Sequence, residues 1–170
     1  MGQERHQAAG GRVRNRFPSL CPYFAMFPET FAAEWLERLT EPGDVVLDPF
    51  CGRGTLPLEA LLLGRAAIGC DINPVAYCVT RAKTNTPGIA SVKRRITVLE
   101  RGFNAKEWEP ERCRMPEFFR VAYRASVLRQ ILYLRRELKW QHSDTDAMVA
   151  ALTLGSLHGE SERSPSFLSN

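Results

Sequence analysis

Apolar residues recur at helical spacing in several stretches of the chain. The first, Glu29–Leu39, has one apolar face formed by Phe31, Ala32, Trp35, Leu36 and Leu39, which predicts an amphipathic helix. The same period predicts helices over residues 89–100, 118–138 and 143–157. Residues 96–99, Ile-Thr-Val-Leu, could form a strand instead.

Two short apolar runs, residues 44–48 and 66–70, are bounded by turns and glycines and predict fully buried parallel strands. A helix is predicted after each run. The first covers residues 55–63 with Thr55 as its N-cap, and the second covers residues 74–84. This order of strand, glycine loop, helix, strand, acid and helix predicts a βαβα unit with a parallel sheet.

The pattern divides the chain into four segments. Residues 1–16 are polar and expected to be disordered, and residues 17–86 hold the βαβα unit. Residues 87–158 are mainly helical, and residues 159–170 form a polar tail. The expected fold class is α/β: a partial Rossmann-like doubly wound parallel sheet with a helical C-terminal half.

Composition limits the class of protein. The 170 residues are 44% hydrophobic and 25% charged, which is typical of a globular domain without disulfide or metal staples. No apolar run approaches the ~20 residues of a membrane span, and the first residues lack a secretion signal. The five cysteines contain no CxxC pair. We therefore expect reduced thiols, a cytoplasmic location and no metal site.

Basic residues gather in the second half. The net charge is only +4, but residues 112–139 contain eight basic residues and two acidic ones. Arginine binds phosphate oxygens through a planar fork, so this region is a candidate nucleic-acid contact, or else a solvated helix face. The candidate residues are Arg120, Arg124, Arg129 and Arg136.

A glycine loop follows the first predicted strand. Residues 48–55 read Asp-Pro-Phe-Cys-Gly-Arg-Gly-Thr, and Gly52 and Gly54 allow positive φ and close approach of a ligand. The third glycine of a dinucleotide fingerprint is absent, because Pro57 stands there, and no lysine is placed to hold a nucleotide phosphate.

An acidic residue ends each predicted strand. Asp48, at the loop entrance, would repel pyrophosphate but suits a cationic ligand such as S-adenosylmethionine. Asp71, 17 residues after Gly54, is placed to accept hydrogen bonds from both ribose hydroxyls. Turn formation or helix capping is the alternative for both aspartates. Their matched positions around one loop favour the ligand interpretation.

These residues carry a resemblance to a known family. The loop at 48–55 resembles the cofactor motif of the DNA amino-methyltransferases, Asp-Pro-Phe-x-Gly-x-Gly-Thr. The segment Gly-Cys-Asp-Ile-Asn-Pro at 69–74 is similar to their ribose-binding motif, and residues 22–28 resemble the segment at the methionine end of the cofactor. The resemblance is specific over residues 17–86 and implies a class I methyltransferase fold, S-adenosylmethionine as cofactor and DNA as partner.

The resemblance also implies roles for single residues. Asp48 and the loop glycines would hold the methionine moiety, Asp71 the ribose, and Ile72 would lie against the adenine. Phe24 and Phe27 would close the methionine end, or simply anchor their own loop. The residues assigned to the cofactor are Phe24, Phe27, Asp48, Pro49, Phe50, Cys51, Gly52, Gly54, Thr55, Asp71 and Ile72.

The family's catalytic motif is missing from the sequence. That motif, Asp, Asn or Ser followed by Pro-Pro and an aromatic residue, binds the target amine and stacks on the flipped base. Its nearest match, Ser164-Pro165-Ser166-Phe167, lacks the second proline, so no catalytic residue is predicted. The chain is interpreted as the cofactor-binding part of a DNA methyltransferase, inactive alone, and either truncated after Asn170 or completed by another polypeptide.

Two other functions remain open. A tRNA or rRNA guanine methyltransferase can share the loop motif. However, such enzymes commonly carry an RNA-binding domain upstream, and only about 16 polar residues precede the aromatic segment, which favours DNA. A non-catalytic cofactor-binding or interaction module is the second alternative.

Overall fold

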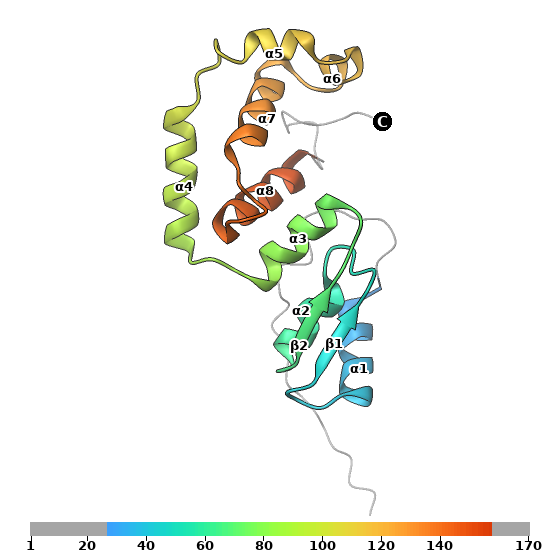
Figure 1. The fold of residues 1–170 in the computed structure, drawn as a ribbon. Helices are drawn as coiled ribbons and strands as arrows, with labels where there is room; N and C mark the ends of the chain where they lie inside the picture. Colours follow the sequence, from blue (N-terminus) through green and yellow to red (C-terminus); the bar gives the residue numbers. More distant parts are fainter. Residues whose placement is uncertain (1–26, 158–170) are drawn as a thin grey trace, which may run out of the picture.

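The computed structural model describes residues 27–157, which form a small sheet unit and a helical half (Figure 1). The elements in chain order are α1 (Glu29–Leu39), β1 (Val45–Asp48), α2 (Thr55–Leu62), β2 (Ala66–Gly69), α3 (Pro74–Thr84), α4 (Ile89–Gly102), α5 (Glu109–Arg114), α6 (Glu117–Ala122), α7 (Ala125–Glu137) and α8 (Asp144–Leu157).

The sheet unit has the predicted βαβα order. Strands β1 and β2 are parallel, with Leu47 paired to Ile68; α2 packs against both strands, and α1 packs against α2. The side chain of Asn73 caps α3 by accepting a hydrogen bond from the Val75 N–H at 2.9 Å. The prediction for Thr55 was wrong: it is the first residue of α2, and Gly54 occupies the N-cap position without a side-chain cap.

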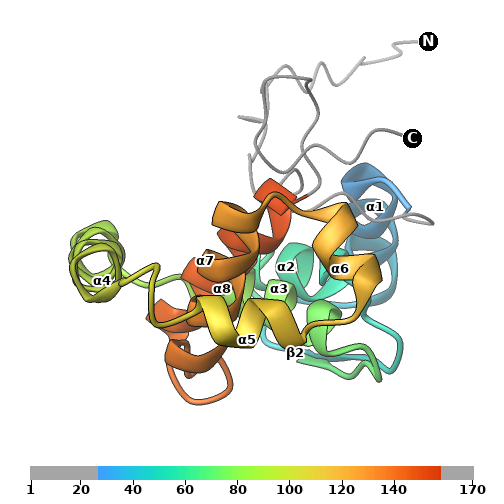
Figure 2. The same ribbon diagram turned by 90° about the horizontal axis from the view of Figure 1, so that it is seen from above.

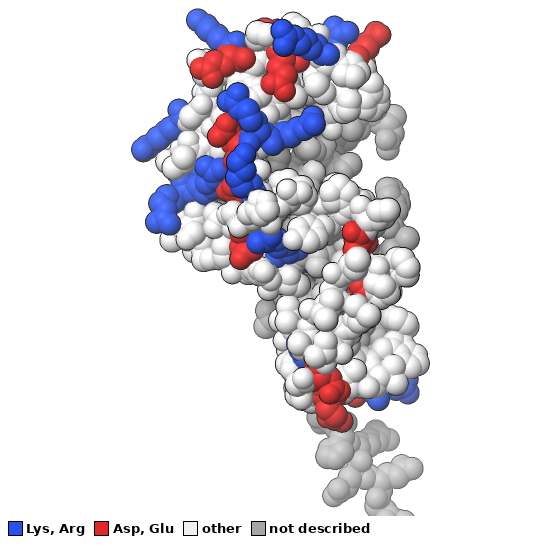
Figure 3. All heavy atoms as spheres, in the orientation of Figure 1, with Lys and Arg blue, Asp and Glu red and all other residues white. Residues whose placement is uncertain are grey.

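No element of residues 27–157 covers one face of the sheet, so the prediction of fully buried strands was also wrong. Register places Val45, Leu47 and Ile68 on the same face, where they are 66%, 63% and 56% exposed. Figure 3 shows this side of the sheet unit as largely uncharged surface. The α/β class is confirmed, but the sheet in residues 27–157 has two strands and most of the structure is helical.

The helical half is built on α3, which packs along α8. Its core joins Val79 and Ala82 of α3 to Leu99 of α4, the buried Trp108 and Leu128 of α7. Helix α4 contacts α8, and α5 and α6 contact α7 at the far end (Figures 1 and 2). Residues 96–99 are helical, which settles the alternative left open by their sequence.

The single helix predicted over residues 118–138 is two helices. Tyr123 and Arg124 have extended backbones, with ψ of 139° and 145°, so α6 ends and α7 begins in a new direction. The sequence contains no helix breaker at this point, so local propensity favours one continuous helix. The side chain of Tyr123 packs against the helical core, and this tertiary contact outweighs the local helix propensity.

A buried carboxylate joins three parts of the helical half. Asp146 accepts hydrogen bonds from Arg95 Nε of α4 at 2.7 Å and from the Lys139 N–H at 2.8 Å. Its own N–H donates to Ser143 Oγ at 3.2 Å, so the Ser143 side chain caps the start of α8. None of the helices in residues 27–157 combines the length and apolar character needed to span a bilayer.

Candidate functional site

The glycine loop lies at the carboxyl ends of both strands. It is tied to β2 by the Cys51 N–H, which donates to the Cys70 carbonyl at 2.9 Å. The predicted positive φ is confirmed at Gly52 (51°) and Gly54 (76°). A Cβ atom at Gly54 would lie 2.6 Å from Thr80 Oγ1, so only glycine fits between the loop and α3.

Asp71 connects the loop to the start of α3. Its Oδ2 accepts the Gly52 N–H and its Oδ1 accepts the Asn73 N–H, each at 2.8 Å. Asp48 Oδ1 accepts the Phe50 N–H at 3.2 Å. Both acids therefore have the turn-forming role considered as their alternative. A carboxylate has about four lone-pair sites, so the two bonds to Asp71 leave acceptor capacity for a ligand.

Helix α3 supports the loop from behind through residues that the sequence reasoning missed. Thr80 Oγ1 donates to the Gly52 carbonyl at 3.0 Å, and the buried Lys83 Nζ donates to the Arg53 carbonyl at 2.8 Å. The sequence did contain a signal for these contacts. Thr80 and Lys83 lie three positions apart, on one side of a helix that also carries the apolar Val79 and Ala82. These bonds fix the loop backbone.

Of the apolar candidate residues, Phe50 belongs to the glycine loop and Ile72 comes just after β2, whereas Phe27 lies just before α1. Phe50 is 86% exposed, and Ile72 is fully exposed. Phe27 is half exposed and its ring contacts that of Phe31 at 5.6 Å, while Phe24 lies outside the described residues. Exposed apolar side chains beside two carboxylates leave apolar surface that a bound ligand could cover.

Cys51 is a buried thiol within the glycine loop. Burial raises the pKa of its thiol above the ordinary value of 9.0; the Thr80 hydroxyl opposes the change, and the Asp48 and Asp71 carboxylates add to it. The thiol therefore stays protonated at neutral pH and acts as a small apolar group. Within residues 27–157 no three His, Cys, Asp or Glu side chains gather in a way that could hold a metal ion.

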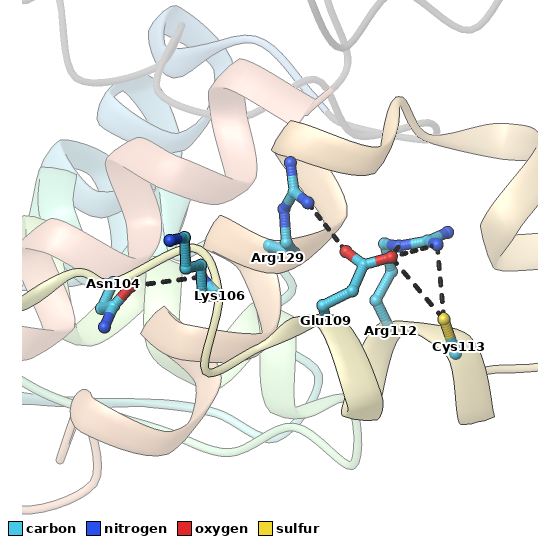
Figure 4. A network of polar contacts seen from close by, with 6 residues as sticks. All are labelled: Asn104, Lys106, Glu109, Arg112, Cys113 and Arg129. Carbon is cyan, nitrogen blue, oxygen red and sulfur yellow. Dashed lines mark hydrogen bonds and ion pairs between the residues drawn. The ribbon is translucent and has the colours of Figure 1, made fainter.

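The four candidate arginines do not form one surface. Arg120 and Arg124 are exposed around α6, whereas Arg129 Nη1 pairs with Glu109 Oε2 at 2.7 Å. Figure 4 shows the Glu109 carboxylate between Arg129 and Arg112. The guanidinium of Arg136 lies over the Trp108 ring at 4.1 Å. Arg129 and Arg136 therefore make contacts within the helical half.

The Glu109 ion pairs predict a pH dependence of stability. Hydrogen bonds from Arg112 and Arg129 lower the pKa of Glu109 from 4.5 to about 2. Because the folded pKa is depressed, the stabilisation is complete above about pH 4.5 and is lost as the pH falls towards 2. In urea unfolding, Glu109→Gln should be less stable than wild type at pH 7, and this difference should shrink by pH 3. Glu111→Gln, an exposed change in the same helix, should show no such convergence.

A loop at the carboxyl edge of parallel strands, with one acid at the end of β1 and another just after β2, defines the chain as an α/β protein with a candidate ligand site. Residues 3–80 match the sequence model of the DNA methylase family. The Type II methyltransferase M.XycI of Xanthomonas campestris pv. cyanopsidis is 37% identical over 78 residues, 41% of this chain and 26% of that protein. The predicted resemblance to the DNA amino-methyltransferases is therefore confirmed for this segment.

Other methyltransferases match the same part of the chain. The tRNA (guanine(10)-N2)-dimethyltransferase of Methanocaldococcus jannaschii is 44% identical over 63 residues, 35% of this chain and 18% of that protein. The ribosomal protein L11 methyltransferase of Mannheimia succiniciproducens is 43% identical over 58 residues, 34% and 20% of the two chains. The matches span about a quarter or less of these relatives. No solved structure matches significantly.

Proposed function

We propose that residues 17–86 bind S-adenosylmethionine, and that the chain is the cofactor-binding part of an enzyme that methylates the exocyclic amine of adenine or cytosine in DNA. The observation that carries this proposal is the placement of Asp48 and Asp71 on either side of one glycine loop, at the same edge of two parallel strands. The confirmed resemblance of residues 3–80 to DNA methylases supports the choice of cofactor and of DNA.

The residues at the loop fit this cofactor. Asp71 retains acceptor sites for the ribose hydroxyls, and the exposed Ile72 offers an apolar surface for the adenine ring. Asp48 would attract the cationic methionine end, beside Phe50. When bound, S-adenosylmethionine supplies an electrophilic methyl group. The residues of this chain bind and orient it, while the acceptor for the target amine comes from elsewhere.

The exposed apolar face of the sheet indicates that a further segment packs there. Val45, Leu47 and Ile68 expose apolar surface on one side of the sheet, and parallel sheets are normally covered on both faces. We propose that a further segment, carrying the Pro-Pro-aromatic motif that this sequence lacks, covers this face and extends the two strands to a Rossmann-like sheet. An enzyme with this substrate and reduced cysteines would act in the cytoplasm.

An RNA substrate is the second candidate, since a tRNA guanine methyltransferase matches the same residues. Methylation assays on the chain joined to a segment with the missing motif, using DNA and tRNA in parallel, distinguish the two. The chain alone should be inactive on both. If the complemented chain methylates neither, a non-catalytic cofactor-binding module becomes the better interpretation.

Cofactor binding can be tested on the chain alone by calorimetry. Asp71→Asn should weaken S-adenosylmethionine binding by about 10- to 100-fold, because hydrogen bonds to a charged group contribute about 1.5–3 kcal/mol. Asp71 also holds the loop, so Ile72→Ala is the cleaner variant: its side chain is fully exposed, and the change should lower affinity about five-fold without altering stability. Ile89→Ala, also exposed, is the matched control. Unchanged affinity in both Asp71→Asn and Ile72→Ala would contradict the proposed site.

A further inference from the structure

Helix α6 exposes an aromatic pair at the far end of the helical half. Phe118 and Val121 are 71% and 79% exposed, and the rings of Phe118 and Phe119 contact edge to face at 5.3 Å. The extended backbone at Tyr123 and Arg124 separates α6 from α7, and the side chains of α6 are not part of the helical core. Clustered exposed aromatic side chains of this kind typically mark a binding surface.

Three arginines lie within six residues of this aromatic pair along the chain. Arg114 ends α5, Arg120 lies within α6, and Arg124 follows it; all three are exposed. In the described part of the chain none of them has an ion pair, whereas Arg112 and Arg129, on the adjacent helices, are held by Glu109. The acidic residue of α6 itself is Glu117. The surface therefore presents unpaired positive charge beside exposed aromatic rings.

This combination suits one class of partner. Arginine forks bind phosphate oxygens, while aromatic rings stack on unpaired bases whatever their sequence. An apolar protein partner would need acidic groups against three arginines to fit the same surface. Charge complementarity therefore favours a nucleic-acid strand with accessible bases over a protein.

The position of α6 agrees with this partner. Figure 1 places α6 beyond the carboxyl ends of β1 and β2, and Figure 2, seen from above, shows it over α2 and α3. The glycine loop lies at that same edge of the sheet. A strand bound at α6 would thus lie on the side of the molecule where the methyl donor is proposed to bind.

We infer that the α6 surface, formed by Phe118, Phe119, Arg114, Arg120 and Arg124, binds unpaired nucleotides, with Phe118 stacking on a base and the arginines contacting the flanking phosphates. The inference deepens the proposed function and rests on it for the placement of the strand near the methyl donor. The contact itself requires neither cofactor nor catalysis. Single-stranded DNA and single-stranded RNA both offer unpaired bases and phosphates to this surface, and the experiment distinguishes between them.

The test is fluorescence anisotropy of the full chain with labelled oligonucleotides of about 20 nucleotides, long enough for one binding site. Single-stranded DNA, single-stranded RNA and duplex DNA are compared without cofactor. Phe118→Ala should weaken binding of the preferred single strand about ten-fold, since stacking on one ring is lost. Ile89→Ala removes an equally exposed apolar side chain from α4 and should leave the affinity unchanged. When log K is plotted against the logarithm of the salt concentration, replacing the three arginines with alanine should make the slope less steep by about 2.

Two outcomes would overturn the inference. One is binding of nucleic acid with equal affinity by wild type and Phe118→Ala. The other is no binding of any oligonucleotide. If light scattering then shows a dimer that Phe118→Ala dissociates, the surface is a protein interface instead. Calorimetry with S-adenosylmethionine, run on the same samples, reports on the cofactor site separately, so failure of one proposal is distinguishable from failure of the other.

Discussion

Replacing Asp146 with alanine is expected to destabilise the protein by about 3–5 kcal/mol, the usual cost of breaking a buried ion pair from one side. The Asp146 side chain is 7% exposed, and it accepts hydrogen bonds from Arg95 and from the Lys139 N–H. Its loss leaves Arg95 bound only to the Glu137 carbonyl and the Lys139 N–H without its acceptor. Urea unfolding followed by circular dichroism measures this change.

Asp144 provides the matched control. It lies two residues earlier and pairs with Arg81 at a similar distance, 2.8 Å, but its side chain is 43% exposed. Solvent screens such a pair, so Asp144→Ala should cost less than about 1 kcal/mol. Equal losses for the two variants would show that burial of Asp146 does not stabilise the helical half.

The second large effect is expected at Gly54. Alanine there must adopt a φ of 76° and place its Cβ 2.6–2.9 Å from three atoms of Thr80. The left-handed backbone costs about 1–2 kcal/mol, and forcing extra volume into a packed site adds about 1–3 kcal/mol. Gly54→Ala should therefore lose about 2–5 kcal/mol in unfolding experiments, and with it the S-adenosylmethionine affinity proposed for the loop.

Gly64 separates the two contributions. Its φ is 77°, almost that of Gly54, but an added Cβ would meet only Pro42 at an ordinary 3.8 Å. Gly64→Ala should thus lose only the backbone contribution of about 1–2 kcal/mol. If Gly54→Ala and Gly64→Ala lose the same free energy of unfolding, the close approach of Thr80 contributes nothing to the cost at Gly54. The tight packing inferred there would then be wrong.

The sheet unit could be predicted closely because its signals are local. Pro42 and Gly43 end α1, Asn73 and Pro74 open α3, and the glycines fix the loop between β1 and α2. The exposure of Val45 and Leu47 could not be predicted. An apolar run indicates that a strand is stable only when other elements pack on it. It does not show whether the neighbouring elements of the chain bury both of its faces.

The arginine region shows a different limit. Arg120 and Arg129 contribute equally to the positive charge of this region. In the structure, however, Arg120 is exposed, whereas Arg129 forms an ion pair with Glu109, 20 residues earlier in the chain. Helix α5, which carries Glu109, has too few apolar residues to show a period. The break at Tyr123 likewise depends on packing against the core. Tertiary contacts decided these features, and the sequence pattern does not contain them.

Helix α3 belongs to both halves of the molecule. One side donates to the glycine loop through Thr80 and Lys83, and the other, with Cys78, Val79 and Ala82, packs in the helical core. Any ligand that holds the loop also holds α3, and so stabilises the helices against which α3 packs. Binding at the loop would thereby be coupled to the order of the helical half through α3 itself.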